Sequence, residues 1–129
     1  MPGMHAALVR FLTFAILFFS FVLKADNWPA WRGPFGTGKS AEKEFPIEWS
    51  RQKNVRWRVA LPERGNSSPI VWGQKVFVTQ ALEGQGLRQL ICFDRKTGKT
   101  LWEKNVEFDL KEPTHRTNPY CSASPVTDG

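Results

Sequence analysis

Short apolar strands separated by tight turns fill the second half of the chain, and this feature limits the possible folds more than any other. Turn residues recur at Gly73-Gln74, at Gly84-Gln85-Gly86 and in the D-R-K-T-G-K run at 94–99. In that run Asp94 can cap the turn through its side chain, and Gly98 accepts a left-handed backbone. Connections this short join antiparallel strands and leave no room for a crossover helix. The pattern predicts one antiparallel meander of four strands, at 68–72, 75–80, 87–94 and 99–108.

Part of this pattern occurs twice. Ser68-Pro69-Ile70-Val71-Trp72-Gly73 is matched, 56 positions later, by Ser124-Pro125-Val126-Thr127-Asp128-Gly129. Apolar and basic residues alternate along 54–61, which predicts a further, half-buried strand. Trp57 in that strand and Trp102 in the last strand of the meander occupy equivalent places, about 45 positions apart. A period of about 40–50 residues with four strands per unit is typical of a β-propeller blade.

The same stretches resemble a known family. They are W-P-A-W-R-G-P-F-G-T-G-K-S at 28–40, R-G-N-S-S-P-I-V-W-G at 64–73, D-R-K-T-G-K-T-L-W at 94–102 and S-A-S-P-V-T-D-G at 122–129. Together they resemble exported PQQ-binding-like (pyrroloquinoline quinone repeat) β-propeller proteins. They are also similar to the outer-membrane-assembly propeller and, more distantly, to quinoprotein dehydrogenases.

The resemblance implies a ring of seven or eight four-stranded blades. Asp94, Thr97, Gly98 and Trp102 match the hallmark of the repeat. Trp102 is then expected to dock blade on blade by stacking near the neighbouring turn, and the strand at 54–61 to complete the last blade. A ring needs at least four blades. Since the chain holds about one and a quarter, we expect the natural protein to be longer.

The expected fold is therefore all-β: a four-stranded meander, equal to about one and a quarter blades, preceded by an irregular arm and a signal helix. In chain order, the expected segments are a signal peptide at 1–25, a Trp/Pro/Gly-rich arm at 26–53, a strand completing the last blade at 54–62, the first blade at 63–110, and a loop with the start of a second blade at 111–129.

Residues 1–25 have the pattern of a secretory signal peptide. A basic start, an uncharged run of thirteen residues (11–23) and a small residue, Ala25, precede Asp26. The run is shorter than the roughly twenty residues that span a membrane. The sequence leaves two alternatives open: the signal peptide is cleaved before Asp26, or it is retained as a membrane anchor. We expect an exported protein of the periplasm or extracellular space, without stable membrane insertion once the signal is cleaved.

Charge gives no sign of a nucleic-acid partner. The net charge is +6, and removal of Arg10 and Lys24 with the signal lowers it to +4. The remaining basic residues are scattered and form no block interleaved with aromatic residues. The expected partners are therefore further blades or other envelope proteins.

Residues 33–40, G-P-F-G-T-G-K-S, match the phosphate-binding loop pattern letter for letter. Such a loop needs a buried strand before it and a helix after it. Here Pro29 interrupts the preceding segment, and Pro46 closes the following one after at most one and a half turns. We interpret the match as a coincidence and expect no nucleotide site; the glycines let the arm turn over an aromatic surface.

The sequence indicates no catalytic, cofactor-binding or metal-binding residues. Cys92 and Cys121 could pair in an exported protein, but Cys92 lies in an apolar strand, where cysteine usually acts as a small hydrophobe. His115 is close to Cys121 in sequence, without an evident orienting group for a catalytic pair. Pyrroloquinoline quinone is expected only in a full-length homologue, because no adjacent cysteines or grouped carboxylates occur here.

Two functions fit these observations. The first is a non-catalytic exported scaffold whose propeller faces bind envelope proteins or polymers. The second is the N-terminal part of an exported quinoprotein-type oxidoreductase whose active site lies in blades outside this sequence.

Overall fold

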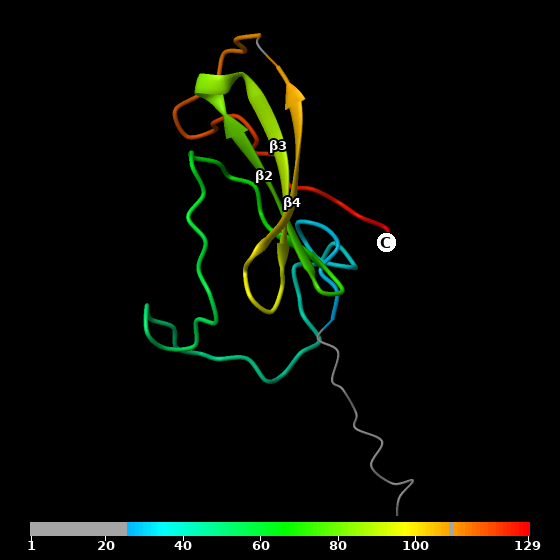
Figure 1. Cartoon of the computed structure of the whole chain (residues 1–129). Helices are drawn as coiled ribbons and strands as arrows, with labels where there is room; N and C mark the ends of the chain where they lie inside the picture. Colours follow the sequence, from blue (N-terminus) through cyan, green and yellow to red (C-terminus); the bar gives the residue numbers. More distant parts are fainter. Residues whose placement is uncertain (1–25, 109) are drawn as a thin grey trace, which may run out of the picture.

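A four-stranded antiparallel sheet forms the centre of the molecule (Figure 1). The computed structural model describes residues 26–108 and 110–129. The strands follow in sequence order across the sheet, β1-β2-β3-β4, as a meander. The predicted all-β, antiparallel meander without a crossover helix is confirmed for this part of the chain. The elements are β1 (Ile70–Trp72), β2 (Lys75–Leu82), the 3-10 turn η1 (Glu83–Gln85), β3 (Leu87–Asp94) and β4 (Thr100–Glu107).

The signal peptide expected at 1–25 lies outside the described residues. Within 26–108 and 110–129, the structure contains no helix with the length and apolar character of a membrane span.

The first strand is shorter than predicted because serine side chains replace backbone pairing at its start. The ladder between β1 and β2 begins at the pair Ile70 and Phe77. Beyond this pair, the Ser67 hydroxyl accepts the Thr79 N–H at 3.0 Å, and the Ser68 N–H donates to the Ser124 hydroxyl at 2.9 Å. These bonds satisfy groups that would otherwise extend the sheet.

One face of the sheet carries a small apolar core. Val78, Ile91 and Phe93 are buried there, and Val59 packs against them from outside the sheet. Two buried glutamines extend the row: Gln80 donates to the Glu63 carbonyl, and the Gln89 amide donates to side chains of β4. We call this the first face. The register places the intervening residues on the second face, among them Phe77 and Trp102.

Strand β4 forms an outer edge of the sheet and is mostly exposed. A bulge interrupts its pairing with β3, since Cys92 pairs with Trp102 while Phe93 pairs with Thr100. The extra residue, Leu101, is 50 % exposed. Bulges and charged residues are common at such edges because they discourage pairing with other chains.

Residues 54–61 lie along the first face without forming a strand. The strand predicted here is absent because the segment has no hydrogen-bonded ladder partner among the described residues. It covers the core through side chains instead, and a hollow of about 230 Å³ remains between Val59–Pro62 and the sheet. Its assignment to the last blade stays a prediction.

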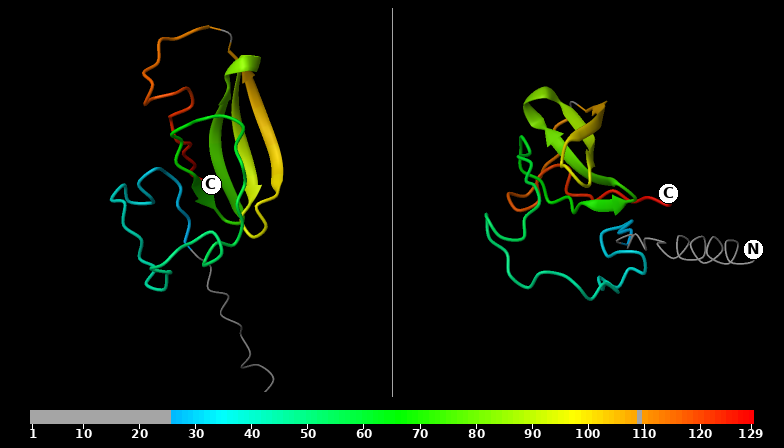
Figure 2. Two further views of the ribbon diagram at one scale, coloured as in Figure 1. Left: turned by 90° about the vertical axis from the view of Figure 1, so that its left-hand side faces the viewer. Right: turned by 60° about the horizontal axis from the view of Figure 1, so that its bottom comes forward.

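The arm at 26–53 has two parts. Its beginning pairs with the sheet, because Trp28 forms an isolated bridge with Val71 of β1. Residues 39–53 then loop away from the sheet, as all three ribbon views show (Figures 1 and 2). Trp49 and Ile47 in this loop are 62 % and 86 % exposed.

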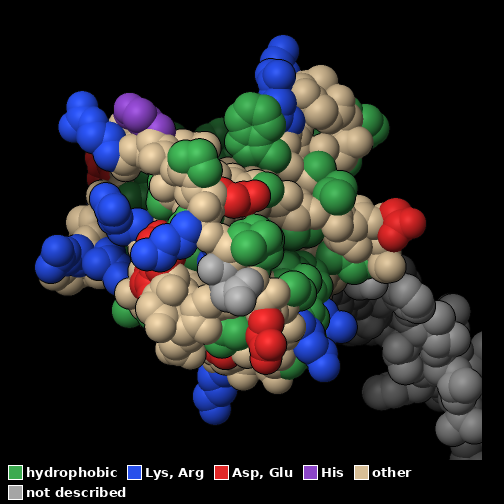
Figure 3. Space-filling view, turned by 90° about the horizontal axis from the view of Figure 1, so that it is seen from above, with side chains coloured by type: hydrophobic (Ala, Val, Ile, Leu, Met, Phe, Trp, Pro, Cys, Tyr) green, Lys and Arg blue, Asp and Glu red, His purple; other side chains and the backbone are tan. Residues whose placement is uncertain are grey.

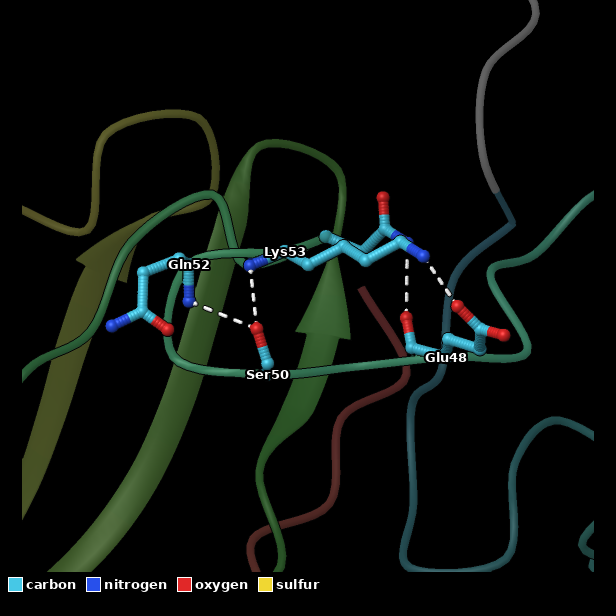
Figure 4. A network of polar contacts seen from close by, with 5 residues as sticks. Glu48, Ser50, Gln52 and Lys53 are labelled. Carbon is cyan, nitrogen blue, oxygen red and sulfur yellow. Dashed lines mark hydrogen bonds and ion pairs between the residues drawn. The ribbon is translucent and has the colours of Figure 1, made fainter.

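Local polar contacts organise the end of that loop (Figure 4). The Ser50 hydroxyl accepts the N–H groups of Gln52 and Lys53 at 3.2 and 3.0 Å. The Lys53 ammonium pairs with the Glu48 carboxylate, and the Asn54 amide donates to the Glu48 carbonyl. Exposed ion pairs contribute only about 0–1 kcal/mol. These contacts therefore shape the loop without attaching it to the sheet.

The G-P-F-G-T-G-K-S segment forms consecutive turns, and the described residues directly after Ser40 are not helical. Gly33, Gly36 and Gly38 all have positive φ. A Cβ at Gly33 would lie 2.8 Å from the Trp28 ring, so the backbone turns directly over that aromatic surface. The segment thus has the context of an aromatic-packed turn, as expected from its sequence.

Candidate functional site

The turn between β3 and β4, residues 94–99, is held by several internal hydrogen bonds, and we call it the docking turn. The Asp94 carboxylate accepts the Thr97 N–H and hydroxyl at 2.7 Å each, and the Lys96 N–H at 3.1 Å. The Asp94 carbonyl accepts the Gly98 N–H at 2.8 Å, and Gly98 has a φ of +73°. Asp94 and Gly98 therefore lie where the turn chemistry of the sequence places them.

Trp57 lies on this turn from outside the sheet. Its indole N–H donates to the Arg95 carbonyl at 2.9 Å. A Cβ at Gly98 would lie 2.6 Å from the indole ring, so the ring rests directly on the glycine backbone. The ring also contacts Phe93, with centroids 6.5 Å apart. The turn and the tryptophan thus form a fitted contact between segments about forty residues apart in sequence.

The charge of Asp94 supports the docking turn. Hydrogen bonds hold the pKa of this carboxyl below its ordinary value, the Thr97 hydroxyl contributing most. Because the folded pKa is lowered, the stabilisation is complete above the unfolded value of about 3.9 and is lost as the pH falls through the folded pKa. We expect Asp94→Asn to lower the free energy of unfolding at pH 7 and to have a smaller effect at pH 3. An equal effect at both pH values, measured by urea unfolding, would contradict a role for the charge.

The second S-P segment packs beside the first. Ser68 donates its N–H to the hydroxyl of Ser124, its counterpart in the repeat. Pro69 and Pro125 follow these serines in the two segments. The Thr79 hydroxyl, on the second face, donates to the Ala123 carbonyl at 2.7 Å. At the far ends of the two segments, a Cβ at Gly129 would meet the Trp72 ring at 2.9 Å, whereas a Cβ at Gly73 would meet nothing within 4 Å.

Trp102 lies on the second face and is half-buried. Its ring packs on Phe77, with centroids 5.8 Å apart. Its sequence counterpart Trp57 covers a turn, whereas the ring of Trp102 contacts Phe77 of its own sheet. The predicted docking of Trp102 against a neighbouring turn stays a prediction.

A shallow hollow of about 290 Å³ opens at the opposite end of the sheet, between η1 and the loop that follows β4. The guanidinium of Arg88 lies there between the rings of Tyr120 and Phe108, 4.1 and 5.0 Å from their centroids. The Tyr120 hydroxyl donates to the Glu112 carbonyl at 2.6 Å. Figure 3 looks onto this end and shows hydrophobic, acidic and basic side chains intermixed. These contacts hold the loop against the sheet.

The imidazole and the two thiols make separate local contacts. His115 contacts the Thr117 hydroxyl within its own loop at 2.8 Å. Both cysteines are free thiols, and burial raises the pKa of each, an effect that the charge of Arg88 partly opposes at Cys121. Raised pKa values keep these thiols protonated and unreactive. Across the described ranges, no three His, Cys, Asp or Glu side chains gather in a way that could hold a metal ion.

Two contacts were not foreseen from the sequence. They are the pairing of Trp28 with β1 and the position of Arg88 between two aromatic rings. A basic residue inside a strand pattern is the only signal for the second, and the first has no local signal at all. Comparison with known proteins adds no identity, because no family model, curated protein or solved structure matches the chain.

Proposed function

We propose that residues 26–129 are the opening part of an exported β-propeller of the PQQ-like repeat type, acting as a non-catalytic binding scaffold in the cell envelope. In this proposal the sheet β1–β4 is the first blade. Residues 54–62 belong to the outer strand of the last blade, and residues 120–129 begin the second blade. Signal cleavage before Asp26 and a periplasmic or extracellular location are parts of the same proposal.

One observation carries the proposal: each face of the sheet contacts a segment that the repeat makes equivalent to part of a neighbouring blade. Trp57, the counterpart of Trp102, covers the docking turn from the first face. The segment containing Ser124, the counterpart of Ser68, lies against the second face through Thr79. A ring of identical units needs such paired contacts on both faces of every blade.

The partial exposure of the second face supports the proposal that further blades follow. Its row Phe77 and Trp102 is only half-buried, and Val106 is 66 % exposed. Residues 120–127 contact this face at Thr79 and at Arg88. Under the proposal, the remainder receives the rest of the second blade, and Trp102 docks on that blade's turn as Trp57 docks on Gly98.

The described residues offer no ligand set for an oxidoreductase site in this part of the chain. Quinone chemistry in the wider fold uses a calcium ion and a carboxylate base. No group of acidic side chains here could hold such an ion. The docking turn accounts for Asp94, and the two cysteines are not adjacent. The residues present therefore do not fit the cofactor, and the alternative function requires an active site in other blades.

The proposal is tested by the intact mass and N-terminal sequence of the protein exported by its source. We expect a mass several times that of residues 26–129 and an N-terminus at Asp26. A mass matching residues 26–129 alone would overturn the proposal of a closed propeller ring. Titration of the exported protein with pyrroloquinoline quinone and Ca²⁺ then separates the two functions: an unchanged quinone absorption spectrum supports the scaffold, and a saturable change supports the oxidoreductase.

A further inference from the structure

The start of the arm fills the free edge of β1. The Trp28 N–H donates to the Val71 carbonyl at 2.8 Å, and the Val71 N–H donates back to the Trp28 carbonyl at 2.9 Å. The Asn27 side chain accepts the Gly73 N–H at 2.7 Å. These bonds are the pattern of an added antiparallel strand.

The same arm also reaches the second S-P segment. The Pro29 carbonyl accepts the Thr127 N–H at 3.0 Å. Thr127 is the repeat counterpart of Val71, by the offset that relates Ser124 to Ser68. Two successive arm residues therefore bind the same position of two consecutive repeats, so the arm bridges them.

The part of the arm that binds this edge is held in shape by its own internal contacts. The Trp28 ring lies against Gly33, and the Trp28 indole N–H donates to the Trp31 carbonyl at 3.4 Å. Further backbone bonds close the unit, from Gly33 to Ala30 and from Gly38 to Arg32, both at 2.9 Å. Residues 27–38 thus hold their own turn conformation and present Asn27, Trp28 and Pro29 to the edge.

The connection between the arm and the rest of the chain is long and exposed. Residues 39–53 are exposed throughout and loop away from the sheet (Figure 2). Extended at about 3.3 Å per residue, they span about 50 Å. A recognition unit on such a connection can pair with its own chain or with another copy, which is the usual condition for exchange of an element between protomers.

We infer that the outer edge of β1, together with Thr127, is a strand-addition site whose ligand is the arm segment 27–38. We infer further that this site accepts the same segment from a second copy of the chain. Main-chain pairing provides the affinity, and the Trp28–Gly33 turn provides the selectivity. This inference concerns contacts within residues 27–129 and does not depend on closure of a ring.

The test uses a fluorescein-labelled peptide with the sequence of residues 26–38, which stands for the arm of a second copy. It is titrated against the intact chain and against the variants Trp28→Ala and Trp31→Ala, with fluorescence anisotropy as the readout. The attached arm competes at an effective concentration of about millimolar. We therefore expect the Trp28→Ala chain, whose own arm is weakened, to bind the peptide about tenfold or more tightly than the intact chain.

Two matched controls make the result specific. Trp31 is 66 % exposed, so the Trp31→Ala chain should bind the peptide like the intact chain. A peptide carrying Trp28→Ala should bind the Trp28→Ala chain at least about tenfold more weakly than the unmodified peptide. Equal binding of the two peptides, or equal binding by the three chains, would overturn the inference.

Hydrogen exchange keeps the test decisive if Trp28→Ala perturbs folding. In the intact chain the amides of Val71 and Thr127 should be protected together. In the Trp28→Ala chain both should exchange faster, while Val78 and Ile91, paired in the central ladder, stay protected. Addition of the peptide should restore protection at Val71 and Thr127. Loss of protection at all four amides without restoration by the peptide would also overturn the inference.

Discussion

Replacing Gly98 by alanine is expected to lower the free energy of unfolding by about 2–4 kcal/mol. Two costs add at this position. The φ of +73° is unfavourable for any residue with a Cβ, at roughly 1 kcal/mol or more. The new methyl group would also lie 2.6 Å from the Trp57 ring, and relieving such an overlap costs about 1–3 kcal/mol. Equilibrium urea unfolding measures the sum.

Two other glycines separate these costs. Gly73 has a φ of +56° with open space around it, so Gly73→Ala should cost only the backbone part, about 1 kcal/mol. Gly84 has open space and no positive φ, so Gly84→Ala should be close to neutral. If Gly98→Ala costs no more than Gly73→Ala, then Trp57 does not rest on the turn.

A double-mutant cycle assigns the excess to the tryptophan. In a Trp57→Ala background the overlap is gone, and the cost of Gly98→Ala should fall to that of Gly73→Ala. Trp57→Ala by itself removes the hydrogen bond to Arg95 and the contact with Phe93. An unchanged cost of Gly98→Ala in that background would place the strain in the turn alone.

Much of the sheet could be predicted because its determinants are local. The apolar run within L-R-Q-L-I-C-F-D, followed by a capping Asp94 and a left-handed Gly98, predicts β3 with the bounds that the structure shows. The predicted end of β2, Gln80, lies two residues before the observed end at Leu82, because pairing with β3 continues to Leu82 and Leu87. Hydrogen-bonded partners, rather than propensity, decide where a strand ends.

The contacts of the candidate site could not be predicted as readily because they join distant segments. Alternation at 54–61 indicates a buried side, and Val59 does pack on the core, but without a paired strand the segment does not enter the sheet. Trp28 has no alternating neighbours, yet it forms the bridge to Val71. Here tertiary context overrides the local pattern.

Ile91→Ala is the second substitution with a large expected effect, a loss of about 3 kcal/mol within a range of roughly 2–5 for buried isoleucine. Ile91 is 3 % exposed and lies between Val78 and Phe93 in a core that has few other members. A core this small leaves little reserve, because small domains bury a lower share of their apolar surface. We expect the Ile91→Ala chain to be unfolded already near room temperature, so that a thermal melt shows no cooperative unfolding transition.

The exposed residue Val106 is the matched control. It lies on β4, is 66 % exposed, and Val106→Ala should change the free energy of unfolding by no more than about 0.5 kcal/mol. The pair also tests the proposed ring. In a longer exported protein, the second face would be covered, so Val106→Ala should become costly while Ile91→Ala becomes more tolerable against a larger total stability. If Val106→Ala stays neutral in that protein, the second face is not where the next blade packs.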